Sequence, residues 1–280
     1  MIDRKSRLIS WLSACFPNAK IQLTSVDGDA GFRQYFRFLV EGDSFIAVDA
    51  PPEYSNNEAF VQLSLCFNEN GVSAPKVIKK NLEQGFFVIE DFGRRLLGKE
   101  LNESTVDSFY TLAMVELIKI KKLNTQEQYS LPHYDAAFVR RELDIFSEWL
   151  LAEHLALALS THENLQLSKC FDLLVESALE QPYVTMHRDF HSRNLMLLDN
   201  GELGVIDFQD AVFGPLTYDI VSLLRDCYVS WPPEKVEEWL KYFYNLLKEN
   251  ELDGNIPWSK FQKWFDLMGI QRHVKASGIF

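Results

Sequence analysis

The segment "FRQYFRFLVEGDSFIAVDAPP" alternates apolar and polar positions on both sides of a Gly42-Asp43 turn. Alternation with a period of two predicts a half-buried strand, and a tight turn between two such runs predicts a hairpin. We therefore expect strands near residues 34–40 and 44–49. The runs "KVIKK" and "GFFVIE", separated by the polar "NLEQ", predict a second pair of strands.

Residues 56–68, between the two strand pairs, follow a helical period that places Phe60, Leu63 and Phe67 on one face. The N-terminal "MIDRKSRLISWLSACFP" mixes charges with a broken apolar run, which is typical of an amphipathic helix rather than a signal peptide. The first ninety residues therefore indicate a small, mostly antiparallel sheet with one inserted helix.

From residue 103 the pattern becomes helical. The stretch "ESTVDSFYTLAMVELIKIKKL" begins with a Ser104/Thr105 cap. The stretch "YDAAFVRRELDIFSEWLLAEHLALAL" predicts a long second helix, and a third is expected over about 167–180. We expect the second helix to bury several apolar side chains, namely Phe138, Leu143, Phe146 and Leu150.

One short hairpin interrupts this helical region, with strands near 195–198 and 203–206 joined by an Asp199-Asn200-Gly201 turn. Helices are expected again from there to the end of the chain. The order of elements predicts a two-lobed α+β protein. Its small lobe (residues 1–91) is expected to be an antiparallel sheet, and its larger lobe (residues 92–280) is expected to be mainly helical.

The 280 residues carry a formal net charge of −12, which argues against nucleic acid or an anionic membrane as the main partner. The four cysteines are scattered without a CxxC pair, so a reducing compartment is favoured over a disulfide or zinc framework. No stretch approaches the roughly 18 apolar residues that a membrane span needs. We expect a cytoplasmic protein that binds a small molecule, with a monomer slightly favoured.

The strongest chemical signal is "MHRDFHSRN" before the predicted hairpin and "VIDFQD" after it. Their spacing matches the protein-kinase pattern H-R-D-x-x-x-x-N followed by a metal-binding aspartate. In phosphoryl transfer from ATP, a carboxylate accepts the proton of the acceptor hydroxyl, which fits Asp189. Mg²⁺ takes hard oxygen ligands, which fits Asn194 and Asp207. Each motif alone is weak, but the combination predicts ATP and Mg²⁺ as cofactors.

These motifs carry a family resemblance. The segment "MHRDFHSRNLMLLDNGELGVIDFQDAVFGPLTYDIVSLLRD" resembles the catalytic segment of the aminoglycoside phosphotransferase family, which has a protein-kinase-like fold. Further stretches resemble the bacterial anomeric kinases for N-acetylmuramate and N-acetylglucosamine in cell-wall recycling, among them "GDAGFRQYFR", "SLLRDCYVSWP" and "QRHVKASGIF". The resemblance implies a kinase that phosphorylates the C1 hydroxyl of these sugars, and a chain that ends before the family's usual C-terminus. It also implies that Asp219 stabilises the catalytic loop, that the small lobe (residues 1–91) binds the nucleotide, and that the larger lobe (residues 92–280) carries catalysis and substrate binding. For His187 we expect a structural role, packing and hydrogen bonding within the loop, rather than that of a base.

The nucleotide site departs from the kinase pattern. Aligning V-A-I-K with "IAVD" puts Asp49 where a kinase has its phosphate-binding lysine, and a carboxylate cannot replace that lysine. Arg33 and Arg37, next to the loop that contains Gly28 and Gly31, are our candidates for the missing cation. Their alternative role is that of solvated strand residues.

A second Asp-Phe-Gly spelling, in "EDFG", precedes the catalytic loop and so cannot be the metal site. We expect it at the junction of the lobes, where backbone groups of Ile89, Glu90 and Asp91 would bind adenine and Gly93 would permit the turn. Glu58, on the inserted helix, could pair with a phosphate-binding cation but is more simply a surface residue.

The acceptor is less well defined by sequence. N-acetylmuramate carries a carboxylate, so its site should offer a cation or several amide donors. The candidates closest in sequence to the catalytic motifs are Arg193, Gln209, Arg225, Tyr228 and Trp231. Aromatic side chains on helices are more often core than sugar-binding, and His191 has no clear role at this stage.

Three interpretations remain open. The first is an ATP- and Mg²⁺-dependent amino-sugar kinase, and the second is a related kinase for an aminoglycoside, choline or similar alcohol. The third is a nucleotide-binding pseudokinase, suggested by the missing lysine. The presence of Asp189, Asn194 and Asp207 argues against the third, because a binding module needs no catalytic base.

Overall fold

The computed structural model describes residues 3–26, 32–123, 125 and 129–280, and it forms two compact units. The first unit runs up to Arg94 and includes Met196–Gln209, and the second comprises Arg95–Leu195 and Asp210–Phe280. The segment 196–209 therefore groups with the β-rich unit, although we expected it in the helical one. It does so because the amide of Val205 donates to the carbonyl of Ser73 at 2.7 Å.

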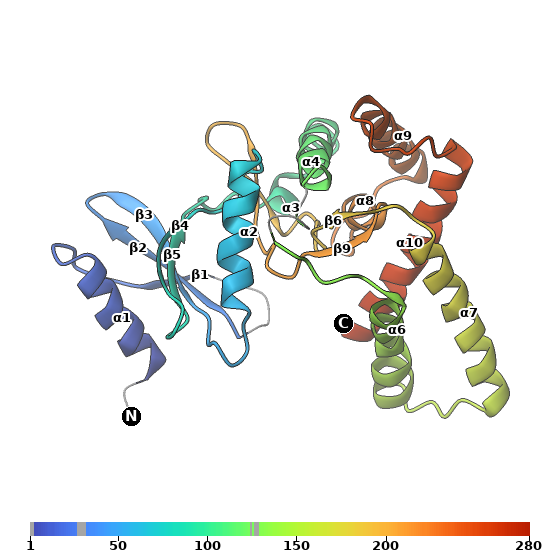
Figure 1. The fold of residues 1–280 in the computed structure, drawn as a ribbon, viewed down its shortest axis with the longest axis horizontal. Coiled ribbons are helices and arrows are strands. Elements are labelled where there is room, and N and C mark those ends of the chain that lie inside the picture. The colour runs from blue at the N-terminus through green and yellow to red at the C-terminus, as the bar shows by residue number, and fades with distance from the viewer. Residues whose placement is uncertain (1–2, 27–31, 124, 126–128) are drawn as a thin grey trace. The chain divides into compact units, whose positions relative to one another are not determined.

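A five-stranded antiparallel sheet in the order β1-β2-β3-β5-β4 forms the centre of the first unit (Figure 1). The predicted hairpin is confirmed, with its loop at Glu41-Gly42, where both residues have positive φ. Such two-residue turns match the twist of the strands, so β3 begins one residue earlier than expected. The elements of this unit are α1 (Arg4–Cys15), β1 (Thr24–Val26), β2 (Gln34–Val40), β3 (Asp43–Asp49), α2 (Asn57–Glu69), β4 (Val77–Asn81) and β5 (Phe86–Glu90).

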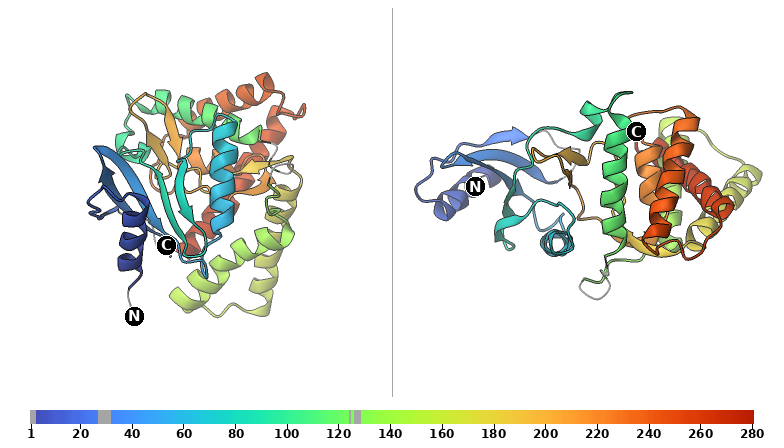
Figure 2. Two further views of the ribbon diagram at one scale, coloured as in Figure 1. Left: turned by 60° about the vertical axis from the view of Figure 1, so that its left-hand side comes forward. Right: turned by 90° about the horizontal axis from the view of Figure 1, so that it is seen from above.

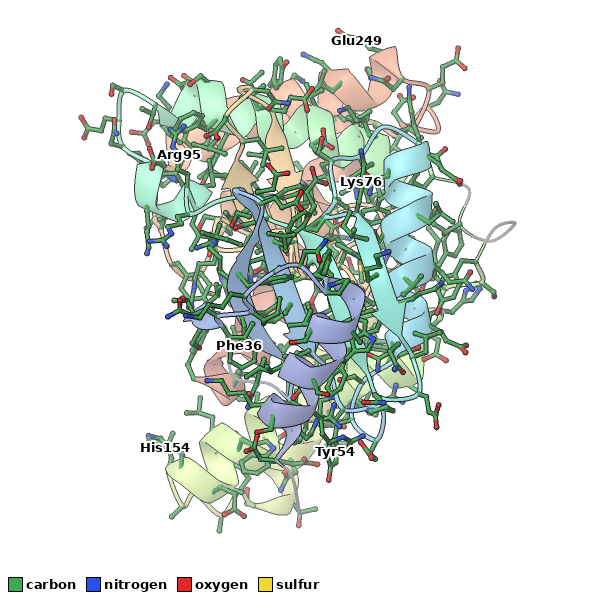
Figure 3. The ribbon with its side chains drawn as sticks, turned by 90° about the vertical axis from the view of Figure 1, so that its left-hand side faces the viewer. Phe36, Tyr54, Lys76, Arg95, His154 and Glu249 are labelled. Carbon is green, nitrogen blue, oxygen red and sulfur yellow. The ribbon has the colours of Figure 1, made fainter. Side chains whose placement is uncertain are left out.

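The helices α1 and α2 cover opposite faces of this sheet (Figures 1 and 2). Successive residues of β5 make this possible, because Phe86 packs with Leu8 and Leu12 of α1 while the ring of Phe87 lies 5.7 Å from Phe60 of α2. Phe36 of β2 belongs to the α1 side of the core (Figure 3). The predicted buried face of α2 is confirmed, since all three of its expected core residues are buried.

The second unit is mainly helical, and its last helix, α10, packs against α6, α7 and α8 (Figure 2). Its elements are α3 (Leu97–Glu100), α4 (Val106–Lys121), α6 (Ala136–Ile145), a π-helix (Phe146–His154), α7 (Thr161–Leu179), β6 (Tyr183–Met186), β9 (Val212–Pro215), α8 (Tyr218–Leu224), α9 (Pro233–Glu249) and α10 (Trp258–Ile279). The predicted hairpin is present as β7 (Leu195–Leu197) and β8 (Leu203–Val205).

Three helix predictions need correction. The long second helix is wrong beyond Ile145, because the chain continues as a π-helix whose wider turn changes which side chains face inward. Of the four side chains expected in its core, only Leu143 is fully buried; Phe138, Phe146 and Leu150 are half-buried. The third helix starts six residues earlier than expected, at Thr161, because Ser160 and Glu163 form a capping box.

The third correction concerns the start of α4. Thr105 occupies the N-cap position, but its side chain does not cap the helix. Its hydroxyl instead donates to the carbonyl of Glu100 at 2.8 Å and accepts from the amide of Asn102 at 3.0 Å. Among the described residues, no helix is long and apolar enough to cross a membrane, and none of the cysteines forms a disulfide.

Candidate active site

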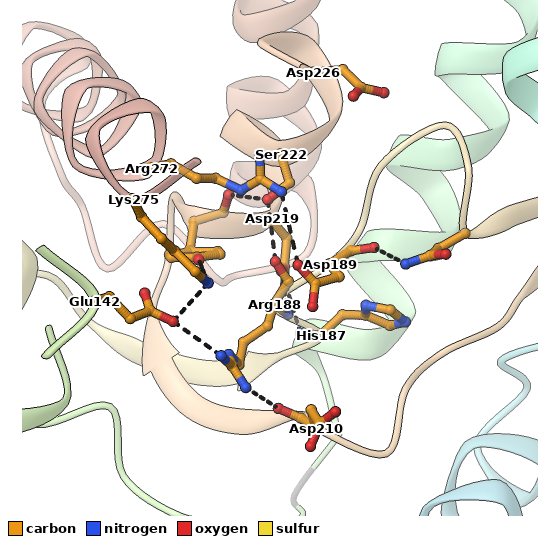
Figure 4. Close-up of polar contacts among 12 residues, drawn as sticks. Glu142, His187, Arg188, Asp189, Asp210, Asp219, Ser222, Asp226, Arg272 and Lys275 are labelled. Carbon is orange, nitrogen blue, oxygen red and sulfur yellow. Dashed lines mark hydrogen bonds and ion pairs between the residues drawn. The ribbon is translucent and has the colours of Figure 1, made fainter. Parts of the chain in front are cut away.

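The loop after β6 carries the predicted catalytic motif, and Asp219 holds its first residues in place (Figure 4). The amides of His187 and Arg188 each donate to one oxygen of the Asp219 carboxylate at 3.0 Å. Arg188 has φ of 76°, a left-handed conformation that costs energy for any residue with a side chain. Two hydrogen bonds to a buried carboxylate offset that cost, so Asp219 fixes the backbone at the start of the loop.

A buried ion cluster stabilises the other end of Arg188. Its guanidinium donates to Glu142 of α6 at 3.0 Å, and Lys275 of α10 donates to the same carboxylate oxygen at 2.7 Å. The hydroxyl of Tyr134 donates to the second oxygen of Glu142, and Gln271 donates to that hydroxyl at 2.9 Å. Burial alone would raise the pKa of Glu142, but Lys275 and Arg188 hold it below its ordinary value. Glu142 is therefore an anion that joins α6, α10 and the catalytic loop.

Asp189, the predicted base, has a side chain that reaches solvent, at 37% exposure. Burial of its surroundings favours a higher pKa for Asp189, yet the nearby cations Lys275, Arg188 and Arg272 hold that pKa below its ordinary value. Asp189 is thus an accessible carboxylate that stays ionised. An ionised carboxylate can accept the proton of an acceptor hydroxyl.

The amide side chain of Asn194 has a fixed orientation. Its Nδ2 donates to the carbonyl of Asp189 at 3.0 Å, and its backbone amide donates to the carbonyl of His191 at 2.9 Å. Since the amide nitrogen is used inside the loop, the side-chain oxygen is the atom that has the chemistry of a Mg²⁺ ligand. The structure therefore brings His187, Asp189, Asn194 and Asp219 together in one unit.

Asp207 belongs to the first unit, where its neighbour Phe208 anchors it. The ring of Phe208 is 1% exposed and stacks on Phe60 at 5.1 Å, while Phe67 packs against it at 5.3 Å. Asp207 itself is exposed and has φ of 64°. The side chain of Gln209, which we predicted to bind substrate, donates to the carboxylate of Asp207 at 2.6 Å.

Asp207 and Asn194 each fit a Mg²⁺ ion by their donor atoms. In the part of the chain that the structure describes, no three His, Cys, Asp or Glu side chains gather into a metal site. Kinases usually bind Mg²⁺ through one or two protein ligands plus the phosphates of the nucleotide, so one carboxylate and one amide oxygen suit that mode.

The junction after β5 is held together by its side chains. Asp91 accepts from Nε and Nη2 of Arg37, at 2.5 and 2.8 Å, and from the hydroxyl of Ser44 at 2.5 Å. Burial would raise the pKa of Asp91, but these donors and the amide of Gly93 lower it. Gly93 has φ of 86°, as the expected turn requires. The Arg37 side chain is therefore bound to Asp91, which argues against it as the phosphate-binding cation.

The other nucleotide candidates lie in the first unit, and their binding roles stay predictions. Ile89 is buried in β5, and the backbone amide of Glu90 donates to the carbonyl of Lys76. Gly28 and Gly31 lie outside the described residues. The Arg33 guanidinium lies 5.6 Å from the Phe60 ring centre, near the start of α2.

Asp49, which aligns with the kinase lysine, forms an ion pair within the first unit. Its carboxylate accepts from Arg4 of α1 at 2.9 Å (Nε) and 2.5 Å (Nη2), so it connects α1 to β3. Glu58 is an exposed residue in the first turn of α2, the simpler of its two expected roles.

Two acceptor candidates have other partners. Arg225 pairs with Asp266 at 2.5 Å and lies over the ring of Phe265. Trp231 is half-buried; its indole donates to the hydroxyl of Tyr110 at 3.1 Å and its ring meets Trp239 edge-on.

Tyr228 and Arg193 lie closer to the catalytic loop. The Arg193 guanidinium is 4.6 Å from the ring centre of Tyr228, and that ring meets His191 edge-on at 5.3 Å. His191 is buried, and burial lowers its pKa although Asp189 and Asp226 oppose that shift.

The site also contains residues that sequence reasoning missed. Lys121 of α4 is buried, and its Nζ lies 3.7 Å from Asp219. Burial lowers the pKa of Lys121, although the nearby Asp219 carboxylate raises it in part. Glu142 and the α10 residues reach the loop from distant parts of the chain. The available signal was a group of polar side chains that share one face of α10: Gln271, Arg272 and Lys275.

Comparisons with known proteins agree with this geometry. A Pseudomonas putida protein named N-acetylmuramate/N-acetylglucosamine kinase is 38% identical, over 92% of this chain and 75% of its own length. A Pseudomonas aeruginosa protein of the same name is 36% identical, over 99% of this chain and 84% of its own. The structure of an aminoglycoside phosphotransferase from Streptomyces rimosus, in complex with ADP and streptomycin, has a TM-score of 0.63 at 14% identity, covering 96% of this chain and 99% of that one.

The structural likeness shows the protein-kinase-like α+β fold, and sequence similarity gives the family. Residues 22–251, which include the catalytic loop, Asp207 and Asp219, match the phosphotransferase enzyme family. This chain belongs to that family, and it is a phosphotransferase.

Proposed function

We propose that this enzyme transfers the γ-phosphoryl group of ATP to the anomeric C1 hydroxyl of N-acetylmuramate and N-acetylglucosamine, with Mg²⁺, in peptidoglycan recycling. The observation that carries the proposal is the accessible, ionised Asp189 on a loop held by Asp219. The names of the relatives at 36–38% identity support the acceptor, and the ADP complex of the structural relative supports the nucleotide. A cytoplasmic location belongs to the same proposal.

In this mechanism, Asp189 accepts a hydrogen bond from the acceptor hydroxyl and takes its proton as the oxygen attacks the γ-phosphorus. Cations around Asp189 make it a weak base, so proton transfer occurs late, as charge leaves the hydroxyl oxygen. Asp219 contributes by fixing the backbone of the loop, which keeps Asp189 in position before the acceptor arrives.

Mg²⁺ would neutralise the phosphates of the nucleotide when bound. For its protein ligands we propose the side-chain oxygens of Asn194 and Asp207. For the adenine we propose backbone groups at Ile89–Asp91, and for the phosphates Arg33 with the loop that contains Gly28 and Gly31. These assignments rest on the order of the motifs and on the chemistry of the side chains.

The test is an ADP-release assay with ATP, Mg²⁺ and four acceptors: N-acetylmuramate, N-acetylglucosamine, choline and kanamycin. We expect turnover with the two amino sugars and none with the two cationic acceptors. Turnover confined to choline or kanamycin would refute the proposed acceptor, and ATP binding without any turnover would indicate a pseudokinase.

A further inference from the structure

Arg272 of α10 is a buried cation beside the predicted base, and among the described residues its guanidinium has no carboxylate within hydrogen-bond distance. Its side chain is 8% exposed, and its Nη2 lies 4.0 Å from Oδ1 of Asp189, a long ion pair (Figure 4). Its guanidinium carbon lies 5.7 Å from the ring centre of Tyr218. Its Nε, buried from solvent, has no hydrogen-bond partner among the residues that the structure describes.

A guanidinium has five N–H donors in a rigid fork, so this burial leaves much of its capacity unused. Burying a charged group without close partners costs free energy, and an anion that supplies them recovers it. A planar carboxylate matches the fork geometry in particular. Arg272 therefore has the properties of a site for a carboxylate beside Asp189.

Neighbouring cations differ in this respect. Lys275 and Arg188 both bind Glu142 at hydrogen-bond distance, and Arg225 binds Asp266 at 2.5 Å. Arg193 is exposed and lies over Tyr228. The contacts of Arg272 all lie in the second unit, whereas our nucleotide-binding candidates belong to the first. Because Arg272 makes its contacts in the second unit, we expect it to bind an anionic group of the acceptor rather than a phosphate of the nucleotide.

We propose that Arg272 binds the carboxylate of the acceptor and thereby distinguishes N-acetylmuramate from N-acetylglucosamine. The inference rests on the proposed function. The two sugars differ in a lactyl ether that carries a carboxylate, and only N-acetylmuramate has it. With the reacting hydroxyl on Asp189, a neighbouring guanidinium is placed to bind a charged substituent of the same sugar ring. Arg272 would then determine specificity, and the shared chemistry would stay with Asp189.

The test compares kcat/KM for N-acetylmuramate, its methyl ester and N-acetylglucosamine. In the wild type we expect the free acid to exceed the ester by about tenfold to hundredfold, the scale of a hydrogen bond between charged groups. In Arg272→Gln that ratio should fall close to one, and in Arg272→Lys it should lie between. Any general effect of the substitution on Asp189 cancels in this ratio, because it changes kcat/KM for the acid and for the ester by the same factor.

A matched control is Lys260→Gln, which removes a cation of the same helix that pairs with Glu180 at 2.6 Å. We expect this variant to keep the wild-type ratio. A wild-type enzyme that uses acid and ester equally would overturn the proposal without any variant, and so would an Arg272→Gln enzyme that keeps the full ratio. If the wild type phosphorylates neither amino sugar, the proposed function itself is wrong.

Discussion

Replacing Glu142 with Gln tests the buried ion cluster behind the catalytic loop. The Glu142 side chain is buried, and one of its oxygens accepts from Arg188 at 3.0 Å and Lys275 at 2.7 Å. Glutamine keeps the shape but removes the charge, so two buried cations lose their anion. Removing one partner of a buried ion pair typically costs about 3–5 kcal/mol. We expect the free energy of unfolding to fall by about 3 kcal/mol at pH 7.

Urea denaturation followed by tryptophan fluorescence measures this change. Glu180→Gln is the matched control, because Glu180 also pairs with a lysine of α10, Lys260, but half of its side chain is exposed. We expect this control to unfold close to the wild type, since exposed pairs contribute little. Equal midpoints for the Glu142 variant and the wild type would refute the role of the cluster.

The comparison of the wild type with Glu142→Gln also gives a prediction about the pH dependence of stability. Lys275 and Arg188 hold the folded-state pKa of Glu142 below its ordinary value of 4.5 despite burial. The charge of Glu142 therefore adds stability that is fully present above pH 4.5 and is lost as the pH falls through the lowered folded value. The gap between wild type and Glu142→Gln should be constant from pH 7 to 5 and should narrow in more acidic solution. A gap that widens on acidification would contradict this sign.

Three other predictions concern the catalytic elements. Asp219→Asn leaves one loop amide without its charged acceptor. This variant should lower kcat by about tenfold to hundredfold, with little change in the KM for ATP. A change confined to KM would contradict this prediction. Phe208→Ala should cost about 3–5 kcal/mol in urea denaturation, against about 0.5 kcal/mol for the exposed Phe32→Ala; equal losses would refute the anchoring role. Asp207→Asn should raise the Mg²⁺ concentration for half-maximal activity at least about tenfold, and an unchanged requirement would exclude Asp207 as a ligand.

The candidate catalytic loop could be located from local sequence, because Asp189 and Asn194 lie in one loop and match a short motif. Asp219 lies in the first turn of α8, far along the chain from that loop, and its role was expected from the family resemblance rather than from spacing. Alternation and β-rich runs predicted β2, β3, β4 and β5, whereas the short β1 was not predicted. The hairpin shifted by one residue because both turn residues adopt positive φ.

Contacts between distant segments could not be predicted in this way. Glu142 and Lys275 are 133 residues apart, and nothing in either segment specifies that they meet. The sequence offers Arg37 as a phosphate-binding cation or as a solvated strand residue, yet Arg37 binds Asp91, which is distant from it along the chain. The π-helix after Ile145 was missed because its sequence continues the apolar pattern of an ordinary helix while the backbone widens.

The most direct test of the central claim is the position and rate of phosphorylation. After incubation with ATP, Mg²⁺ and N-acetylglucosamine, phosphorus NMR should show a sugar phosphate whose signal is split by the anomeric proton. The Asp189→Asn enzyme should form that product at least about 10²-fold more slowly. A phosphate on another hydroxyl, or an Asp189→Asn enzyme with a near-normal rate, would contradict the account.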